Sequence, residues 1–237
     1  YVAAGYTASG GAGISDFWVL KLSLAGVIEW QYAYGGSGDD VAYAVQETSD
    51  GGYVVTGYTY SFGAPTSDVW ILKLASEGDI EWQHIYGGAG DDKAYSVQET
   101  SDEGYIVAGS TQYLGALDHD FWVLKLTSAG FFEWERIYGG FGNEVAYYIQ
   151  ESSDGGYIAA GYTDSFGAGG SDFLLLKLFS DGDIDPSCEL VGSSDATVQD
   201  TSSFAWYTNI PPQPTGAVPQ STEISPQETS AASNLLC

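Results

Sequence analysis

Residues 52–59 read Gly-Tyr-Val-Val-Thr-Gly-Tyr-Thr, and residues 68–74 behind them read Asp-Val-Trp-Ile-Leu-Lys-Leu. Both stretches return every 52 residues, as the aspartate and the lysine of the second stretch show: Asp16, Asp68, Asp120, Asp172, and Lys21, Lys73, Lys125, Lys177. A fixed period of this length is typical of a propeller, a solenoid or another array in which each unit packs its apolar face on the next. The period therefore predicts a repeat architecture.

Each period contains four segments with the pattern of β-strands. In the second copy these segments are residues 41–48, 53–59, 68–75 and 80–86. Gly-containing turns at 49–52 and 77–78 join them into two hairpins. Gly or Pro interrupts every window of helical length, and the third segment is nearly all apolar, as in a strand covered on both faces. Four such strands describe a propeller blade.

The sequence thus predicts an all-β protein, a four-bladed β-propeller of 52-residue, four-stranded blades over residues 1–202. The blades are residues 1–34 together with 195–202, then 41–86, 93–138 and 145–190. The first blade lacks its opening strand. Residues 198–202, Val-Gln-Asp-Thr-Ser, resemble that strand as it stands at 45–49, Val-Gln-Glu-Thr-Ser. We expect residues 195–202 to complete the first blade, or the same blade of a neighbouring molecule, which would leave no unpaired edge there.

Residues 203–237 form an extended C-terminal tail rich in Pro, Ser and Thr. Its prolines make it stiff and suited to lying along a surface or reaching a neighbour. The alternative is a disordered linker, although Phe204, Trp206 and Leu235 are apolar for a solvated segment.

The charge of the chain restricts its partners. Six Lys and Arg stand against 32 Asp and Glu, giving a formal net charge of −26. The basic patch that neutralises phosphates is missing, so nucleic acid and anionic membrane surfaces are excluded as expected partners. The same charge repels copies of the protein, so self-association needs specific contacts, salt or cations.

The chain has no Met, and residue 1 falls inside a repeat, from which we expect that a secretory leader has been removed. No run of about 18 apolar residues occurs, so we expect no membrane span. Cys188 and Cys237 are the two cysteines. A disulfide between them would fit an extracellular location, and two free thiols are the alternative.

Three short motifs carry a resemblance to known proteins: Asp-Gly-Gly-Tyr at 50–53, Gly-Asp-Ile-Glu-Trp at 78–82 and Tyr-Gly-Gly at 86–88. With them, residues 1–202 resemble the blades of secreted bacterial and archaeal β-propellers of the kelch-like and quinoprotein-like sort. The resemblance implies a blade and a secreted protein. It implies no single activity, because one fold serves many functions.

The repeated lysines predict a structural contact. If residues 77–78 form a two-residue turn, the lysine of each third strand lies opposite a tryptophan of the fourth, which predicts the cation–π pairs Lys21–Trp30, Lys73–Trp82 and Lys125–Trp134.

The Gly-rich loops between copies carry adjacent polar residues, and these are the candidate Ca²⁺ ligands: Asp39, Asp40, Asp91, Asp92, Asn143 and Glu144. Carboxylate oxygens on flexible loops suit this ion. The alternative is that they cap turns whose glycines adopt positive φ. We expect no other cofactor.

Catalysis has little support in the sequence. His84 and His119 occupy different positions of the repeat, and neither His-Glu-x-x-His nor Gly-x-Ser-x-Gly occurs. We therefore expect a protein that is not an enzyme: an extracellular structural subunit that assembles with copies of itself into a filament or surface array through its terminal strand and tail. The alternative is a monomeric secreted module that binds a glycan or a protein on one propeller face.

Overall fold

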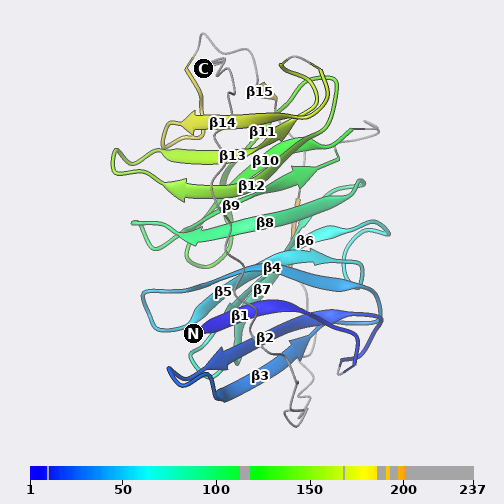
Figure 1. Cartoon of the computed structure of the whole chain (residues 1–237), viewed down its shortest axis with the longest axis vertical. Coiled ribbons are helices and arrows are strands. Elements are labelled where there is room, and N and C mark those ends of the chain that lie inside the picture. Colours follow the sequence, from blue (N-terminus) through cyan, green and yellow to red (C-terminus); the bar gives the residue numbers. More distant parts are fainter. Residues whose placement is uncertain (10, 113–117, 168, 186–190, 193–196, 201–237) are drawn as a thin grey trace, which may run out of the picture.

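The computed structural model of the chain describes residues 1–9, 11–112, 118–167, 169–185, 191–192 and 197–200. These residues form sixteen β-strands in four antiparallel sheets and contain no helix (Figure 1). The prediction of an all-β repeat fold is confirmed. No helix of the described part is long and apolar enough to cross a membrane.

Each sheet is built from consecutive strands. The first holds β1 (Val2–Thr7), β2 (Asp16–Leu22) and β3 (Ile28–Tyr34); the second holds β4 (Asp40–Glu47), β5 (Tyr53–Thr59), β6 (Asp68–Leu74) and β7 (Ile80–Gly87). The third holds β8 (Asp92–Glu99), β9 (Tyr105–Thr111), β10 (Asp120–Leu126) and β11 (Phe132–Tyr138); the fourth holds β12 (Glu144–Glu151), β13 (Tyr157–Thr163) and β14 (Asp172–Leu178). In the second sheet the strand bounds agree with the expected ones to within one residue at each end.

Two short strands near the C-terminus join the outer edges of the middle sheets. β15 (Val191–Gly192) lies antiparallel to β11, and β16 (Thr197–Asp200) lies antiparallel to β7. We expected residues 195–202 beside the first sheet; the described part of that segment pairs instead with the second. A four-residue strand pairs with any free sheet edge, and the resemblance of its sequence to an opening strand does not specify which one.

The sheets pack face to face in chain order, and each interface has its own core. Phe17 and Val19 of β2 pack with Trp70 and Leu72 of β6 in the first interface. The third interface repeats this arrangement two periods later, with Phe121, Val123, Leu174 and Leu176. Figure 1 shows the order along the long axis, from β1–β3 at one end to β12–β14 at the other. Closure of the four sheets into a ring is not seen, because the first and last sheets lie at opposite ends.

A β-bulge interrupts the opening strand of the second, third and fourth sheets. In β4 the register shifts between Ala42 and Ala44, so that Tyr43 is left over from the pairing; Tyr95 in β8 and Tyr147 in β12 have the same position. Opposite the bulge, a Cβ on Gly57 would lie 1.9 Å from the carbonyl oxygen of Val41. Only glycine allows this close approach of two backbones.

Candidate functional site

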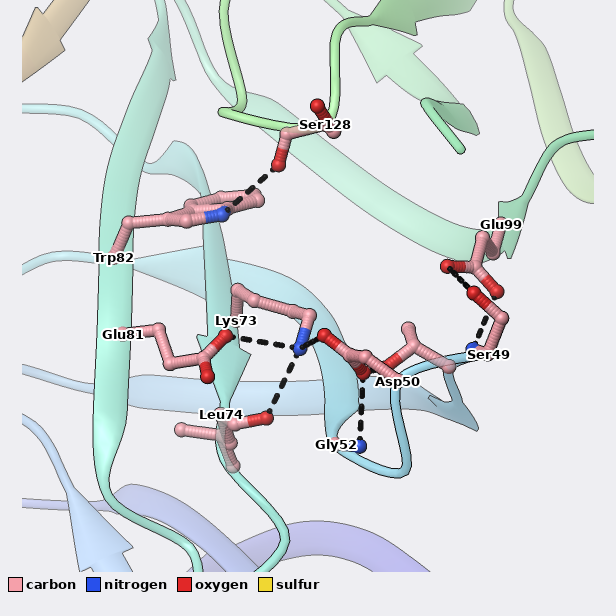
Figure 2. A network of polar contacts seen from close by, with 10 residues as sticks. Ser49, Asp50, Gly52, Lys73, Leu74, Glu81, Trp82, Glu99 and Ser128 are labelled. Carbon is pink, nitrogen blue, oxygen red and sulfur yellow. Dashed lines mark hydrogen bonds and ion pairs between the residues drawn. The ribbon is translucent and has the colours of Figure 1, made fainter. Parts of the chain in front are cut away.

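The predicted lysine and tryptophan residues lie opposite each other in the sheet, but the lysine ammonium group contacts carboxylates and not the indole ring. Lys73 pairs in register with Trp82, and Lys21 and Lys125 pair likewise with Trp30 and Trp134. Figure 2 shows Lys73 Nζ between Asp50 Oδ2, at 2.8 Å, and Glu81 Oε2, at 3.0 Å. The Trp82 indole N–H donates instead to the carbonyl of Ser128 in the next sheet, at 3.2 Å (Figure 2).

In the part of the chain that the structure describes, no cation–π contact joins these three predicted pairs; Lys21 lies over Tyr53 instead, 5.5 Å from the ring centroid. The physical reason is charge. A carboxylate attracts a buried ammonium more strongly than an indole face does, and Asp50 and Glu81 both reach it. The Lys73 ammonium lowers the pKa of Asp50 to about 2. The ammonium groups of these lysines bind residues of the turns, and the lysine recurs in every copy. We therefore assign the lysines a structural role.

The predicted Ca²⁺ ligands are divided among three separate loops, where they accept hydrogen bonds from the protein. Asp40 Oδ2 accepts from the Gly36 amide at 2.8 Å and from the Ser61 hydroxyl at 2.7 Å. Asp92 accepts from the Gly88 amide, and Glu144 from the Gly140 amide, both at 2.9 Å. The neighbouring residues link to the preceding sheet: Asp91 binds Ser67, and Asn143 Oδ1 accepts from the His119 amide.

This arrangement fits loop capping better than cation binding. N–H and O–H groups point at the carboxylates, and a cation would need those oxygens free. Within the described residues no group of three or more Asp, Glu, His or Cys side chains is placed to hold a metal ion. The structure therefore favours the turn-capping interpretation for Asp40, Asp91, Asp92, Asn143 and Glu144; Asp39 contributes its backbone carbonyl, which accepts from the Tyr60 amide.

Each loop also brings two carboxyl groups together across a glycine. A Cβ on Gly87 would lie 2.2 Å from Asp68 Oδ1 and 2.6 Å from Asp92 Oδ2. Burial, reinforced by the Asp92 carboxyl, raises the pKa of Asp68 to about 7, and burial raises the pKa of Asp92 to about 6. In the next copy burial raises the pKa of Asp120 to about 6, with Glu144 beside it. With these raised pKa values, Asp68, Asp92 and Asp120 take up protons at a higher pH than an exposed aspartate does.

The bulge tyrosines form a feature that the sequence analysis missed. Tyr43, Tyr95 and Tyr147 come from three adjacent sheets, and their ring centroids are 4.9 and 5.2 Å apart. Tyr58 and Tyr162 extend the series at its two ends, at 5.7 and 6.0 Å. We call these five residues the tyrosine row. Tyr43 and Tyr147 are 45% and 54% exposed, so the row faces solvent. The recurrence of Tyr at 43, 95 and 147 was the signal in the sequence.

The fourth sheet leaves an apolar face uncovered. Phe173, Leu175 and Ile158 are 72%, 52% and 39% exposed, and we call these three residues the last face. Their equivalents one period earlier, Phe121, Val123 and Ile106, are fully buried against the next sheet. The last face is therefore an interior surface without a neighbour among the described residues.

The first sheet has the complementary surface at the other end. Trp18, Leu20 and Leu22 of β2 are half-buried, and we call them the first face. Their equivalents in the second sheet are Trp70, Leu72 and Leu74, which are at most 1% exposed and pack on the preceding sheet. In every internal interface, a surface like the first face covers a surface like the last face.

Cys188 and Cys237 lie outside the described residues, as do residues 186–190 of the predicted fourth blade. Comparison of the chain with models of known protein families gives no match, and comparison with curated proteins gives none either. The geometry of these surfaces is therefore the basis for a functional proposal.

Proposed function

We propose that this protein is an extracellular structural subunit, built of β-propeller-type blades, which assembles end to end into a filament or surface array. The observation that carries the proposal is the exposure of the last face, whose equivalents are buried at the other interfaces. The proposed partner is the first face of a second copy. The resemblance of the repeats to secreted β-propellers supports the extracellular location.

The internal interfaces supply the template for the joint. The described residues form three sheet-to-sheet cores of the same design, each made by two surfaces that lie one period apart. Docking a first face on a last face would repeat this packing and remove Phe173 and Leu175 from water. Burial of apolar area at about 25 cal/mol per Å² is the driving force. We infer that assembly through these faces does not require the four sheets of one chain to close into a ring.

The symmetry of such a joint determines the product. The two faces are different surfaces at opposite ends of the molecule, so their contact is heterologous. A heterologous contact gives a ring if its rotation closes and an open filament if it does not. The terminal strand and the tail, residues 203–237, remain candidates for a second contact between neighbours, as the sequence suggested.

Salt controls this assembly because each copy carries a net charge of −26. Repulsion between copies opposes docking at low ionic strength, and about 0.15 M salt shortens the range of that repulsion to about 8 Å. We expect assembly to increase with salt, as apolar contacts persist while repulsion is screened.

Negative-stain electron microscopy and light scattering of the full chain, across concentration and salt, test the proposal. We expect regular polymers from the natural protein and single particles from Leu175→Asp, which places a charge in the last face. Phe141→Asp is the matched control, because Phe141 is 100% exposed and lies outside both faces; it should still form polymers.

Single particles of the natural protein under all conditions would refute the proposal, and so would unchanged polymers from Leu175→Asp. A chain ending at Ser203 separates the two contacts. Loss of polymers from that chain, with retention in Leu175→Asp, would make the tail the joint instead of the faces.

A monomeric module that binds a glycan or a protein is the second candidate, and the exposed tyrosine row favours it. Aromatic rings with hydroxyl groups suit sugar rings as well as apolar chains. Binding of a glycan array by single particles, lost in Tyr147→Ala, would support this candidate.

A further inference from the structure

We propose that the tyrosine row binds the uncharged, proline-rich segment of the same chain, residues 210–219. The three bulge tyrosines of the row lie on the opening strands β4, β8 and β12 of three consecutive sheets (Figure 1). Tyr162 of β13 pairs in register with Phe173, so this end of the row borders the last face. The inference goes beyond the proposed function and does not depend on it.

The geometry of the row suits an extended ligand. The bulge in each of the three opening strands presents one tyrosine, and the three bulge tyrosines follow each other at about 5 Å across three sheets. The row is therefore a continuous aromatic strip that is long and narrow. Polyproline chains bind to aromatic-lined surfaces of this kind, since they are already extended and lose little conformational entropy on docking.

The charge of the row suits an uncharged ligand. Burial raises the pKa of Tyr58 and of Tyr95 to about 12, so these phenols stay neutral at physiological pH. Lys93 Nζ lies 4.9 Å from the Tyr58 ring centroid, and Asp39 and Asp164 flank the two ends of the row. In a chain with a net charge of −26, the row is an uncharged surface bordered by charges of both signs.

The proline-rich segment has the matching composition. Residues 201–222 contain no charged side chain, although the chain has 38 charged residues in total (6 basic plus 32 acidic). Within this stretch, residues 210–219 read Ile-Pro-Pro-Gln-Pro-Thr-Gly-Ala-Val-Pro. An acidic segment would be repelled by Asp39 and Asp164, and this one is not.

The distances allow the segment to reach the row of its own molecule. β16 ends at Asp200 on one edge of the second sheet, and β4 forms the opposite edge. Four strand spacings separate them, which is about 19 Å. Neighbouring sheets cover both faces of the second sheet, so the chain has to pass around the ends of its strands, which adds about 10 Å on each side. The thirteen residues from 201 to 213 span up to about 43 Å when extended, so residues 214–219 of the segment can reach the row.

Tyrosine nitration in the full chain tests the contact. The variant Pro211→Ser, Pro212→Ser and Pro214→Ser keeps the length and the zero charge of the segment but removes its polyproline character. We expect tetranitromethane to modify Tyr43 and Tyr147 at least three times faster in this variant than in the natural chain, as read by peptide mass spectrometry. Tyr1, which is 75% exposed and outside the row, should react equally in both.

Pro226→Ser is the matched control, because it removes a proline of the same tail outside the segment; it should leave the rates at Tyr43 and Tyr147 unchanged. Equal nitration rates in the triple variant and the natural chain would overturn the proposal. So would a rise of the same size in Pro226→Ser, because the effect would then not belong to residues 210–219.

A photo-cross-linking residue in place of Gln213 identifies the occupant. In a mixture of nitrogen-15 and unlabelled chains we expect cross-links to the opening strands, residues 40–47, 92–99 or 144–151, with both halves of each cross-link carrying the same isotope. Mixed-isotope cross-links would show that the segment binds a neighbouring copy and would overturn docking within one chain. Cross-links to the first or last face would overturn the assignment of the row.

Discussion

The third and fourth sheets carry nearly the same sequence at equivalent positions but place it in opposite environments. Phe121 is fully buried between sheets, whereas Phe173, the same residue one period later, is 72% exposed. Lys125 and Lys177 differ in the same way, with side chains 3% and 43% exposed. Burial in this array therefore depends on whether a further sheet packs on the strand, and not on the sequence of the strand itself. The stability of each unit is a nearest-neighbour property.

The largest expected effect comes from truncating the two phenylalanines. Phe121→Ala leaves a cavity in a closed core and should lower the free energy of unfolding by about 3–5 kcal/mol. Phe173→Ala should change it by less than about 1 kcal/mol in dilute protein. Denaturant unfolding at low concentration measures both. If both variants lost the same free energy of unfolding, the last face would be covered in the single molecule, and the contrast between Phe121 and Phe173 would be contradicted.

The glycines opposite the bulges give a second matched pair. A Cβ on Gly109 would lie 1.9 Å from the carbonyl oxygen of Lys93, whereas a Cβ on Gly5 meets nothing within 4 Å. Gly109→Ala must displace an opening strand and should cost about 1–3 kcal/mol. Gly5→Ala should be neutral to within about 0.5 kcal/mol, because no opening strand lies beside β1 among the described residues. Thermal unfolding followed by circular dichroism compares the two; destabilisation by Gly5→Ala would reveal a strand beside β1.

The buried carboxyl groups of the interior predict an unusual dependence on pH. The pKa of Asp68 is raised to about 7 in the folded protein, against about 3.9 in an unfolded chain. The folded state thus binds more protons between these values, so the free energy of unfolding falls as pH rises from about 4 to about 7. Asp68→Asn should remove part of this fall, about 1–2 kcal/mol, in denaturant unfolding at pH 4.5 and 8.

Below pH 4 the slope should reverse. Asp50 and Asp102 have pKa values lowered to about 2, chiefly by their lysine partners and in Asp102 against the effect of burial, so their contribution is lost as they become protonated. A pH profile of Asp68→Asn that keeps the full wild-type slope between pH 4.5 and 8 would contradict the assignment of that slope to the Asp68 carboxyl.

The smallest expected effect concerns the lysine networks. In Asp102→Asn the buried Lys125 ammonium keeps only its contacts with Glu133, at 3.3 Å, and with the Leu126 carbonyl. The free energy of unfolding should fall by about 1–2 kcal/mol after solvent screening. Asp154→Asn should have no measurable effect, because Lys177 in the last sheet reaches water. Chemical unfolding of both variants, in low and high salt, checks the contrast. A loss as large in Asp154→Asn would mean that Lys177 is covered in solution.

The sequence was enough to predict the hairpins and the sheets because they are local. Residues 53–59 and 68–74 alternate or run apolar between Gly-containing turns, and the strands formed where this pattern placed them. The register of Lys73 with Trp82 followed from the length of the turn at 77–78. Repetition strengthened each prediction, since the same pattern occurs in several copies.

The remaining features depended on contacts that a linear pattern does not contain. The bulge at Tyr43 arises from the approach of Gly57 to the opposite backbone, so convergence of the tyrosines was not visible from their spacing alone. Phe173 has the same apolar surroundings in sequence as Phe121, and its exposure depends on whether another sheet packs against it. The ion pair of Lys73 with Asp50 was not predicted, because Asp50 is 23 positions away and belongs to the neighbouring hairpin.

The return of β15 and β16 along the outer edges of the middle sheets has a consequence for folding during synthesis. The strands of each sheet are consecutive, so their contacts form early, whereas Thr197 pairs with Gly87 across 110 positions (197 minus 87). Contacts of such long range are made late. Until residues 191–200 have left the ribosome, the edges of β7 and β11 are free to pair with another nascent chain, and the risk of misassembly is highest in that interval.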